Sequence, residues 1–153
     1  MIPSIKRLLI LSLLLFSISA KLFAQTSEKA SWFKDARFGM FIHWGLYSAA
    51  EGMWKGEPLR YMNNYAEWLR YRNRVSKEEY GTLAKRFDWS KIDPEQWVLL
   101  AKEAGMKYII ITAKHHDGVA LWDTKVGHYS LPQLSGSNRD VIKDIAVACR
   151  KHG

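Results

Sequence analysis

Cysteine is almost absent from this sequence, since Cys149 is the only one in 153 residues. A single cysteine cannot form a disulfide within the chain, so a buried core must stabilise the fold. Hydrophobic residues make up 48% of the chain and charged residues 25%, a composition that indicates a globular protein and excludes a disordered one. Cys149 lies among the apolar residues of a predicted helix, and we expect it to belong to the core.

The chain also lacks an apolar run long enough to cross a bilayer comfortably. The run at residues 8–20 follows two basic residues and ends in small ones. This order is typical of a secretory signal peptide. We therefore expect residues 1–24 to be a signal peptide, cleaved after Ala24, and residues 25–153 to be secreted or periplasmic, without a membrane span. The alternative is an N-terminal membrane anchor.

No long stripe of positive charge, internal repeat or low-complexity segment is present. The net charge is +8, and loss of the three cations within residues 1–24 lowers it to about +5. The remaining cations are scattered, as in RYRNR at 70–74. The sequence therefore does not favour nucleic-acid binding.

Two apolar segments predict parallel strands. RFGMFIHWG at 37–45 is aromatic and apolar, and MKYIIIT at 106–112 has no polar alternation. A strand of the second kind is expected to be buried on both faces, in a parallel sheet covered by helices. A long excursion with mixed composition follows the first strand, and we expect a short helix around AEWLRY within it.

Capping signals predict two helices between the strands. A capping box that begins at Ser76 predicts a helix over residues 77–85. Asp93 caps a second helix with Pro94 at its first position, and Gly105 ends it.

The order of elements predicts an α/β fold. Asn138 and Arg139 are expected to open a last helix that ends at Gly153, so strand, excursion, helices, strand, loop and helix form a βα repeat. Two strands cannot complete a barrel or a covered sheet. We therefore expect residues 25–153 to be the N-terminal portion of a larger domain.

Histidines end both predicted strands. His43 ends the first, and His115 and His116 follow the second. Functional groups of βα folds lie at the carboxyl ends of strands, so these three are candidates for one site. Neighbours in a regular strand point to opposite faces, so the doublet can meet one ligand only where the strand ends or bulges. Asp117 and Gly118 indicate a turn at that point.

Two ligand classes suit these side chains. Histidine and aspartate bind metals, but sequence neighbours rarely bind one metal, and no HxH or HExxH spacing occurs. Neutral sugars need hydrogen-bond partners for hydroxyls and aromatic faces for C–H surfaces. Four tryptophans lie near the strand ends or in the excursion: Trp44, Trp54, Trp68 and Trp122. We expect Trp97, on a helix face, to be core instead.

Four segments carry a resemblance to a known family: RFGMFIHWGLYS at 37–48, YAEW at 65–68, AGMKYIIITAKHHDGVALWDTK at 104–125 and NRDVI at 138–142. In order and approximate spacing they closely resemble the α-L-fucosidases of glycoside hydrolase family 29. The resemblance covers nearly everything from Trp32 to Gly153.

The resemblance implies that the chain is the N-terminal part of a (β/α)8 TIM-like barrel, incomplete here. It also implies a retaining exo-glycosidase that hydrolyses terminal α-L-fucose from a fucosylated oligosaccharide or glycoconjugate. The family requires no metal or organic cofactor. Carried over to this chain, His43, His115 and His116 would contact fucose hydroxyls, and Glu67 and Trp68 would also lie at the sugar.

By the same resemblance, the catalytic carboxylates are expected elsewhere. The family's nucleophile and acid/base lie on later strands, beyond Gly153. Asp117 is therefore expected to form a turn, and Asp123 and Asp140 to be structural. Two alternatives remain open: a non-catalytic truncated product or carbohydrate-binding remnant, and a TIM-barrel metallohydrolase that uses the histidine doublet.

Overall fold

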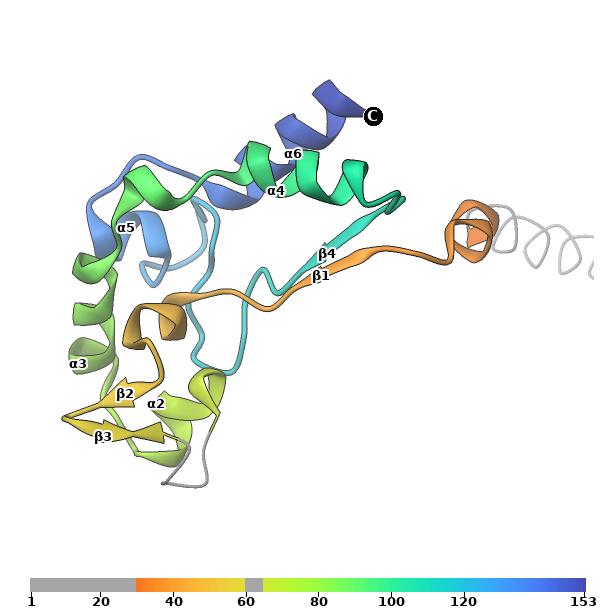
Figure 1. Cartoon of the computed structure of the whole chain (residues 1–153). Coiled ribbons are helices and arrows are strands. Elements are labelled where there is room, and N and C mark those ends of the chain that lie inside the picture. Colours follow the sequence, from red (N-terminus) through yellow and green to blue (C-terminus); the bar gives the residue numbers. More distant parts are fainter. Residues whose placement is uncertain (1–29, 60–64) are drawn as a thin grey trace, which may run out of the picture. The chain divides into compact units, whose positions relative to one another are not determined.

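The structure is a computed structural model that describes residues 30–59 and 65–153 (Figure 1). The chain divides into two units, Met1–Arg37 and Phe38–Gly153. In the first unit, residues 30–36 are helical. The predicted signal peptide lies outside the described residues. Across the part that is described, no helix is long and apolar enough to span a membrane.

Two short parallel strands form one of the two small sheets described in the second unit. β1 (Met40–Ile42) pairs along its whole length with β4 (Ile109–Ile111), in register. This confirms the predicted parallel pairing, although both strands are shorter than their predicted segments. Backbone hydrogen bonds continue beyond the strand ends, from Lys107 N to Phe38 O at 2.8 Å and from Thr112 N to Ile42 O at 3.2 Å.

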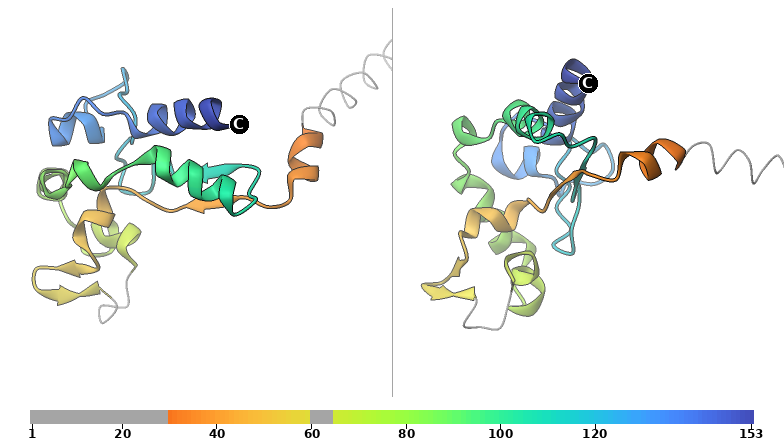
Figure 2. Two further views of the ribbon diagram at one scale, coloured as in Figure 1. Left: turned by 45° about the horizontal axis from the view of Figure 1, so that its top comes forward. Right: turned by 45° about the vertical axis from the view of Figure 1, so that its right-hand side comes forward.

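Helices cover one face of this sheet. α4 (Pro94–Glu103) and α6 (Val141–His152) lie side by side against it (Figures 1 and 2). They bury a cluster against which the half-buried strand residues Ile109 and Ile111 pack: Ile92, Val98, Val141, Ile145 and Ala148. Full burial of such a side chain contributes about 1.5–3 kcal/mol. Cys149 packs against this cluster, as predicted.

The opposite face of the sheet is exposed. Phe41 is 62% exposed and its register partner Ile110 is 40% exposed. The expectation that the second strand is buried on both faces is therefore wrong for the described residues. The physical reason is that α4 and α6 pack only against the side chains that alternate with these two.

Helix ends follow the sequence closely, with one correction. Asp93 Oδ1 accepts hydrogen bonds from the backbone N–H groups at the start of α4, with Pro94 in the first turn, as predicted. α6 is capped by Asp140, whose Oδ1 accepts from Lys143 N at 2.9 Å. The last helix is therefore present as predicted, but Asp140 rather than Asn138 or Arg139 caps it, since its carboxylate accepts from a free N–H of the first turn.

The remaining elements are short: the 3₁₀ turns η1 (Leu46–Ala50), η3 (Ala66–Trp68), η4 (Thr82–Arg86) and η5 (Trp89–Lys91), the helices α2 (Leu69–Arg72), α3 (Lys77–Gly81) and α5 (Leu131–Ser135), and the strands β2 (Met53–Trp54) and β3 (Glu57–Pro58). They surround a second core that includes Leu46, Leu69, Tyr80 and Leu131, all 0% exposed. The short helix in the excursion and the helix after Ser76 are confirmed. The β2–β3 hairpin, η1 and α5 were not predicted.

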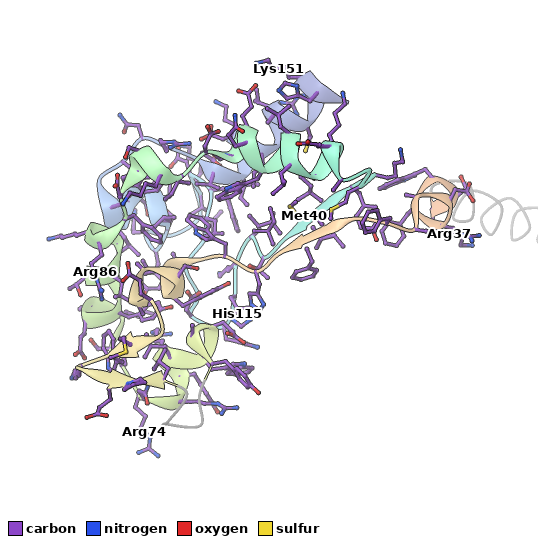
Figure 3. The ribbon with its side chains drawn as sticks, viewed as in Figure 1. Arg37, Met40, Arg74, Arg86, His115 and Lys151 are labelled. Atoms are coloured by element: carbon purple, nitrogen blue, oxygen red, sulfur yellow. The ribbon has the colours of Figure 1, made fainter. Side chains whose placement is uncertain are left out.

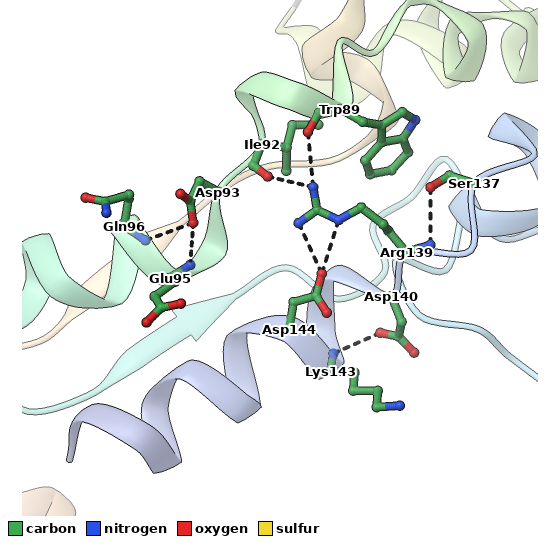
Figure 4. Close-up of polar contacts among 10 residues, drawn as sticks. All are labelled: Trp89, Ile92, Asp93, Glu95, Gln96, Ser137, Arg139, Asp140, Lys143 and Asp144. Carbon is green, nitrogen blue, oxygen red and sulfur yellow. Dashed lines mark hydrogen bonds and ion pairs between the residues drawn. The ribbon is translucent and has the colours of Figure 1, made fainter.

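Arg139 joins the segment before α4 to α6 (Figure 4). Its Nη1 donates to the carbonyls of Trp89 and Ile92 at 3.1 and 2.8 Å. Its Nε and Nη2 both donate to Asp144 Oδ2, at 3.3 and 3.2 Å, and the guanidinium lies 5.8 Å from the Trp89 ring centre. A planar group with five donors suits this arrangement, because it bonds two carbonyls and one carboxylate at once.

We expect Arg139→Ala to lower the free energy of unfolding by about 1–3 kcal/mol, because two carbonyls and Asp144 lose their partner together. Urea unfolding, followed by tryptophan fluorescence, measures this change. Lys143→Ala is the matched control, since Lys143 is an exposed cation in the first turn of α6, four residues after Arg139. Equal free energies of unfolding in the two variants would contradict the proposal that Arg139 stabilises the fold by linking the segment before α4 to α6.

Candidate functional site

Three histidines meet beyond the carboxyl ends of β1 and β4. His43 directly follows β1, and its ring centre lies 5.0 Å from that of His115. The His115 and His116 rings are 4.6 Å apart and nearly perpendicular, at 87°. Figure 3 shows His115 beyond the ends of the two strands. The structure thus gathers all three predicted histidines in one place.

A turn aims the histidine doublet. β4 ends at Ile111, so His115 and His116 do not lie in a regular strand. Gly118 N donates to His115 O at 3.0 Å, and Gly118 has a φ of +82°, which a residue with a side chain rarely adopts. The predicted turn is therefore present, and it removes the alternation that would have sent the two imidazoles to opposite faces.

Trp68 forms an aromatic wall beside the doublet. Its ring stacks on His116 with centres 4.0 Å apart and planes 30° from parallel. It also meets the ring of His115 at 6.1 Å, edge to face. The Arg72 guanidinium lies 5.8 Å from the Trp68 ring centre. Glu67 precedes Trp68 in η3 and is half-buried. Its side chain takes no part in the ring contacts of the described residues, but its carboxylate is near enough to act on the charge of His115.

Tyr47 belongs to this cluster and was not predicted. Its ring lies 5.7 Å from His43 and 5.8 Å from His115. Its hydroxyl bonds Thr112 Oγ1 at 3.2 Å, and Thr112 donates to a backbone carbonyl of the loop after β1. A Cβ at Gly45 would lie 2.7 Å from the Tyr47 ring, so glycine there makes room for it. No spacing rule in the sequence predicts the place of Tyr47 in the cluster, because its hydrogen-bond partner lies 65 residues away.

The electrostatics of the cluster keep His115 uncharged near pH 7. Burial lowers the pKa of His115, and the neighbouring imidazoles of His116 and His43 lower it further. The carboxylates of Asp117 and Glu67 act in the opposite direction, to a smaller extent. A neutral imidazole has one donor and one acceptor nitrogen, which suits an uncharged hydroxyl better than an ionic ligand. Its Nδ1 is buried, which leaves Nε2 to meet a ligand.

Three other tryptophans, Trp44, Trp54 and Trp97, pack against the hydrophobic cores. Trp44 packs against both hydrophobic clusters, with its ring 5.3 Å from Phe87 and 5.8 Å from Trp97. Trp44 therefore lies in the core although it is next to His43, because neighbouring residues at a strand end point to opposite sides. Trp54 packs against the first core. Trp97 is half-buried in the second, as expected.

Asp117 and Asp140, which were expected to have structural roles, accept hydrogen bonds from other groups of the protein. Asp117 is 2% exposed, and its side chain accepts hydrogen bonds from Tyr80 and from the backbone of Val119. Asp140 caps α6 and also accepts from Asp123 N at 3.0 Å. In residues 30–59 and 65–153, no group of three or more histidine, cysteine or acidic side chains is arranged to hold a metal ion.

Comparisons with known proteins converge on one family. The family model described as α-L-fucosidase matches residues 19–153. Tissue α-L-fucosidase of Rattus norvegicus is 34% identical over 127 residues, which cover 78% of this chain and 27% of the relative. The chain therefore spans little more than a quarter of that protein's length.

Two solved structures show the same likeness. The α-L-fucosidase AlfC from Lactobacillus casei, in complex with its α-L-fucose product, gives a TM-score of 0.73 at 42% identity, over 81% of this chain and 37% of that one. An α-L-fucosidase from Bacteroides thetaiotaomicron, trapped as a covalent intermediate, gives 0.69 at 36% identity, over 79% and 27%.

Proposed function

The chain belongs to the α-L-fucosidase family, and from this premise we propose that it is the N-terminal part of a retaining exo-glycosidase that releases terminal α-L-fucose. The substrate would be a fucosylated oligosaccharide or glycoconjugate. In this proposal β1 and β4 belong to a (β/α)8 barrel that later segments complete. The observation that carries the proposal is the cluster of three imidazoles and one indole at the carboxyl ends of two parallel strands.

The cluster suits a neutral sugar in two ways. His43, His115 and His116 supply donors and acceptors for hydroxyls, and Trp68 supplies a flat face for C–H groups. Glu67 adds an acceptor at the same edge. These contacts fix the orientation of the sugar, which lowers the entropic part of the barrier, but they break no bond.

The bond-breaking groups are proposed to lie outside this chain. A retaining glycosidase needs a carboxylate nucleophile and a second carboxyl group as acid/base. Asp117 is held in the core by Tyr80, so it is not available as either group. We propose that both carboxylates come from later strands, beyond Gly153.

We also propose that the enzyme acts outside the cytoplasm. The basic start, apolar run and small-residue exit within residues 1–24 support export to the periplasm or the medium.

Expression of the complete reading frame tests this function. We expect the purified protein to hydrolyse an aryl α-L-fucoside, to leave aryl glycosides of other sugars almost untouched, and to keep its activity in a chelator. Proton NMR should show the α-anomer of fucose as the first product, as retention requires. The absence of fucoside turnover, with fucose binding intact, would favour the alternative of a carbohydrate-binding remnant. Loss of activity in the chelator would favour the metallohydrolase.

A further inference from the structure

Asp117, the residue that follows the histidine doublet, forms a buried hydrogen-bonded pair with Tyr80. The carboxylate of Asp117 is 2% exposed, and the Tyr80 side chain on α3 is 0% exposed. Tyr80 Oη donates to Asp117 Oδ2 at 3.0 Å, while Val119 N donates to Oδ1 at 3.0 Å. Both oxygens of the carboxylate are therefore held, and Asp117 adjoins His116 in the chain.

The same turn is also tied to the element that carries the aromatic wall. Arg70 Nη1 donates to the carbonyl oxygen of Asp117 at 3.2 Å. Arg70 belongs to α2, which follows Trp68 directly. Asp117, which directly follows the doublet, is thus bonded both to α3, through its side chain and Tyr80, and to α2, through its carbonyl oxygen and Arg70.

We propose that Tyr80, acting through Asp117, is a positioning residue for the sugar site, which holds His115 and His116 at the angle they need to meet one ligand. This inference rests on the proposed function for its activity readout. Tyr80 does not touch the sugar in this proposal. It acts by fixing the turn from His115 to Gly118, which contains both imidazoles and lies beyond the end of β4.

The hydrogen bond between Tyr80 and Asp117 is expected to add little to the free energy of folding. Burial raises the pKa of Asp117, and the hydrogen bonds from Val119 N and the Tyr80 hydroxyl offset only part of that effect. A buried carboxylate is costly to desolvate, and neutral groups of the same shape often replace buried ionic ones without loss of stability. The pair therefore contributes more to the placement of the turn than to the free energy of folding.

The surroundings of Asp117 determine how its charge responds to pH. The groups that face it are Tyr80 from α3, Arg70 from α2, His115 from its own turn, and Tyr47 and Tyr129 from neighbouring segments. Arg70 and His115 favour the charged carboxylate, whereas burial opposes it. Because the folded-state pKa is raised, the folded protein binds more protons than the unfolded chain between the two pKa values. The contribution of Asp117 to stability therefore falls as the pH rises through that window.

Tyr80→Phe in the complete enzyme removes one hydroxyl and leaves the ring in the core. We expect kcat/KM for an aryl α-L-fucoside to fall about tenfold, since small displacements of positioning groups have effects of this size. Loss of the hydroxyl removes a hydrogen bond that favours the charged carboxylate, so the pKa of Asp117 rises further. The acidic limb of the pH profile should then move to higher pH. Tyr129→Phe is the matched control, because its hydroxyl donates to the backbone at Lys77 instead.

Asp117→Asn separates placement from stability. We expect it to keep or raise the melting temperature at pH 7, because no charge is buried, and yet to lower kcat/KM. A lower melting temperature in both variants, with an unchanged pH profile, would overturn the inference and leave a purely structural pair. Unchanged kinetics in both variants would also overturn it.

A readout without activity keeps the inference distinct from the proposed function. NMR spectra of the His115 and His116 imidazoles report the placement of the two rings, because their chemical shifts depend on the contacts that these rings make with each other and with Trp68. We expect the imidazole shifts of both histidines to change in Tyr80→Phe and to stay unchanged in Tyr129→Phe. Unchanged shifts in Tyr80→Phe would overturn the inference even where the enzyme is active. Changed shifts in a protein that hydrolyses no fucoside would support the inference and remove the proposed function alone.

Discussion

His115→Ala and His116→Ala are each expected to lower kcat/KM for an aryl α-L-fucoside by about tenfold to a hundredfold in the complete enzyme. Each change removes a hydrogen-bond partner from a site built for hydroxyl groups. A buried hydroxyl left without its partner costs about 1–3 kcal/mol, and 1.4 kcal/mol corresponds to a tenfold change. The loss should be larger than that of a surface substitution, because each change also removes ring contacts with the other imidazole and with Trp68.

The two variants should differ in kind. His116 stacks on Trp68 at 4.0 Å, so His116→Ala also frees the indole and should raise KM. His116→Phe keeps a stacked ring but removes the nitrogen atoms, so any activity that it recovers measures the stack alone. His115 contacts His43, Tyr47 and Trp68 rather than stacking on one ring. Its removal should therefore loosen the whole cluster and affect kcat as well.

His128→Ala is the matched control for both variants. His128 is an exposed histidine and takes no part in the ring contacts of the cluster. Its kinetics should stay within about twofold of the unmodified enzyme, as expected for a surface change. If His115→Ala and His116→Ala behave like this control, the doublet does not belong to the site.

Much of the fold follows from local signals that the structure bears out. Asp93 with Pro94, the capping box at Ser76 and the glycines after helices mark ends through backbone hydrogen bonds, which neighbouring residues decide. The parallel pairing of β1 and β4 follows from the βα order alone. The exposure of Phe41 and Ile110 could not be predicted from local signals, because an apolar strand can have the same sequence whether helices cover one face of the sheet or both.

The site shows where sequence reasoning ends. The three histidines were found because strand ends are local features that the topology brings together. Tyr47 was missed because its role depends on Thr112, which lies 65 residues away and supplies its hydrogen bond. Position in the sequence does not separate Trp44 from His43, yet His43 meets the rings of His115 and Tyr47 while Trp44 packs against both cores. The hydrogen bond between Tyr80 and Asp117 joins residues that are 37 positions apart, and no spacing rule predicts it.

The isolated 153-residue chain is expected to show no turnover of an aryl α-L-fucoside. A retaining mechanism needs two carboxyl groups about 5–5.5 Å apart, one of them free to attack the sugar. The carboxylates whose charge acts on His115 are Asp117 and Glu67. Asp117 has both oxygens occupied by Tyr80 and Val119 in the core. Of these two carboxylates in the described part of the chain, only Glu67 is left free, and one carboxylate cannot fill both roles.

The measurement compares release of the aryl group by the isolated chain and by the complete enzyme at equal concentration, with NMR spectra to establish that the chain is folded. Robust turnover by the chain would contradict the prediction. Glu67→Gln and Asp117→Asn would then show whether either carboxylate is responsible. Weak binding of fucose without turnover is the expected behaviour of the folded chain, because under the proposed function the first strands supply groups that orient the sugar and later strands supply the carboxylates that cleave the bond.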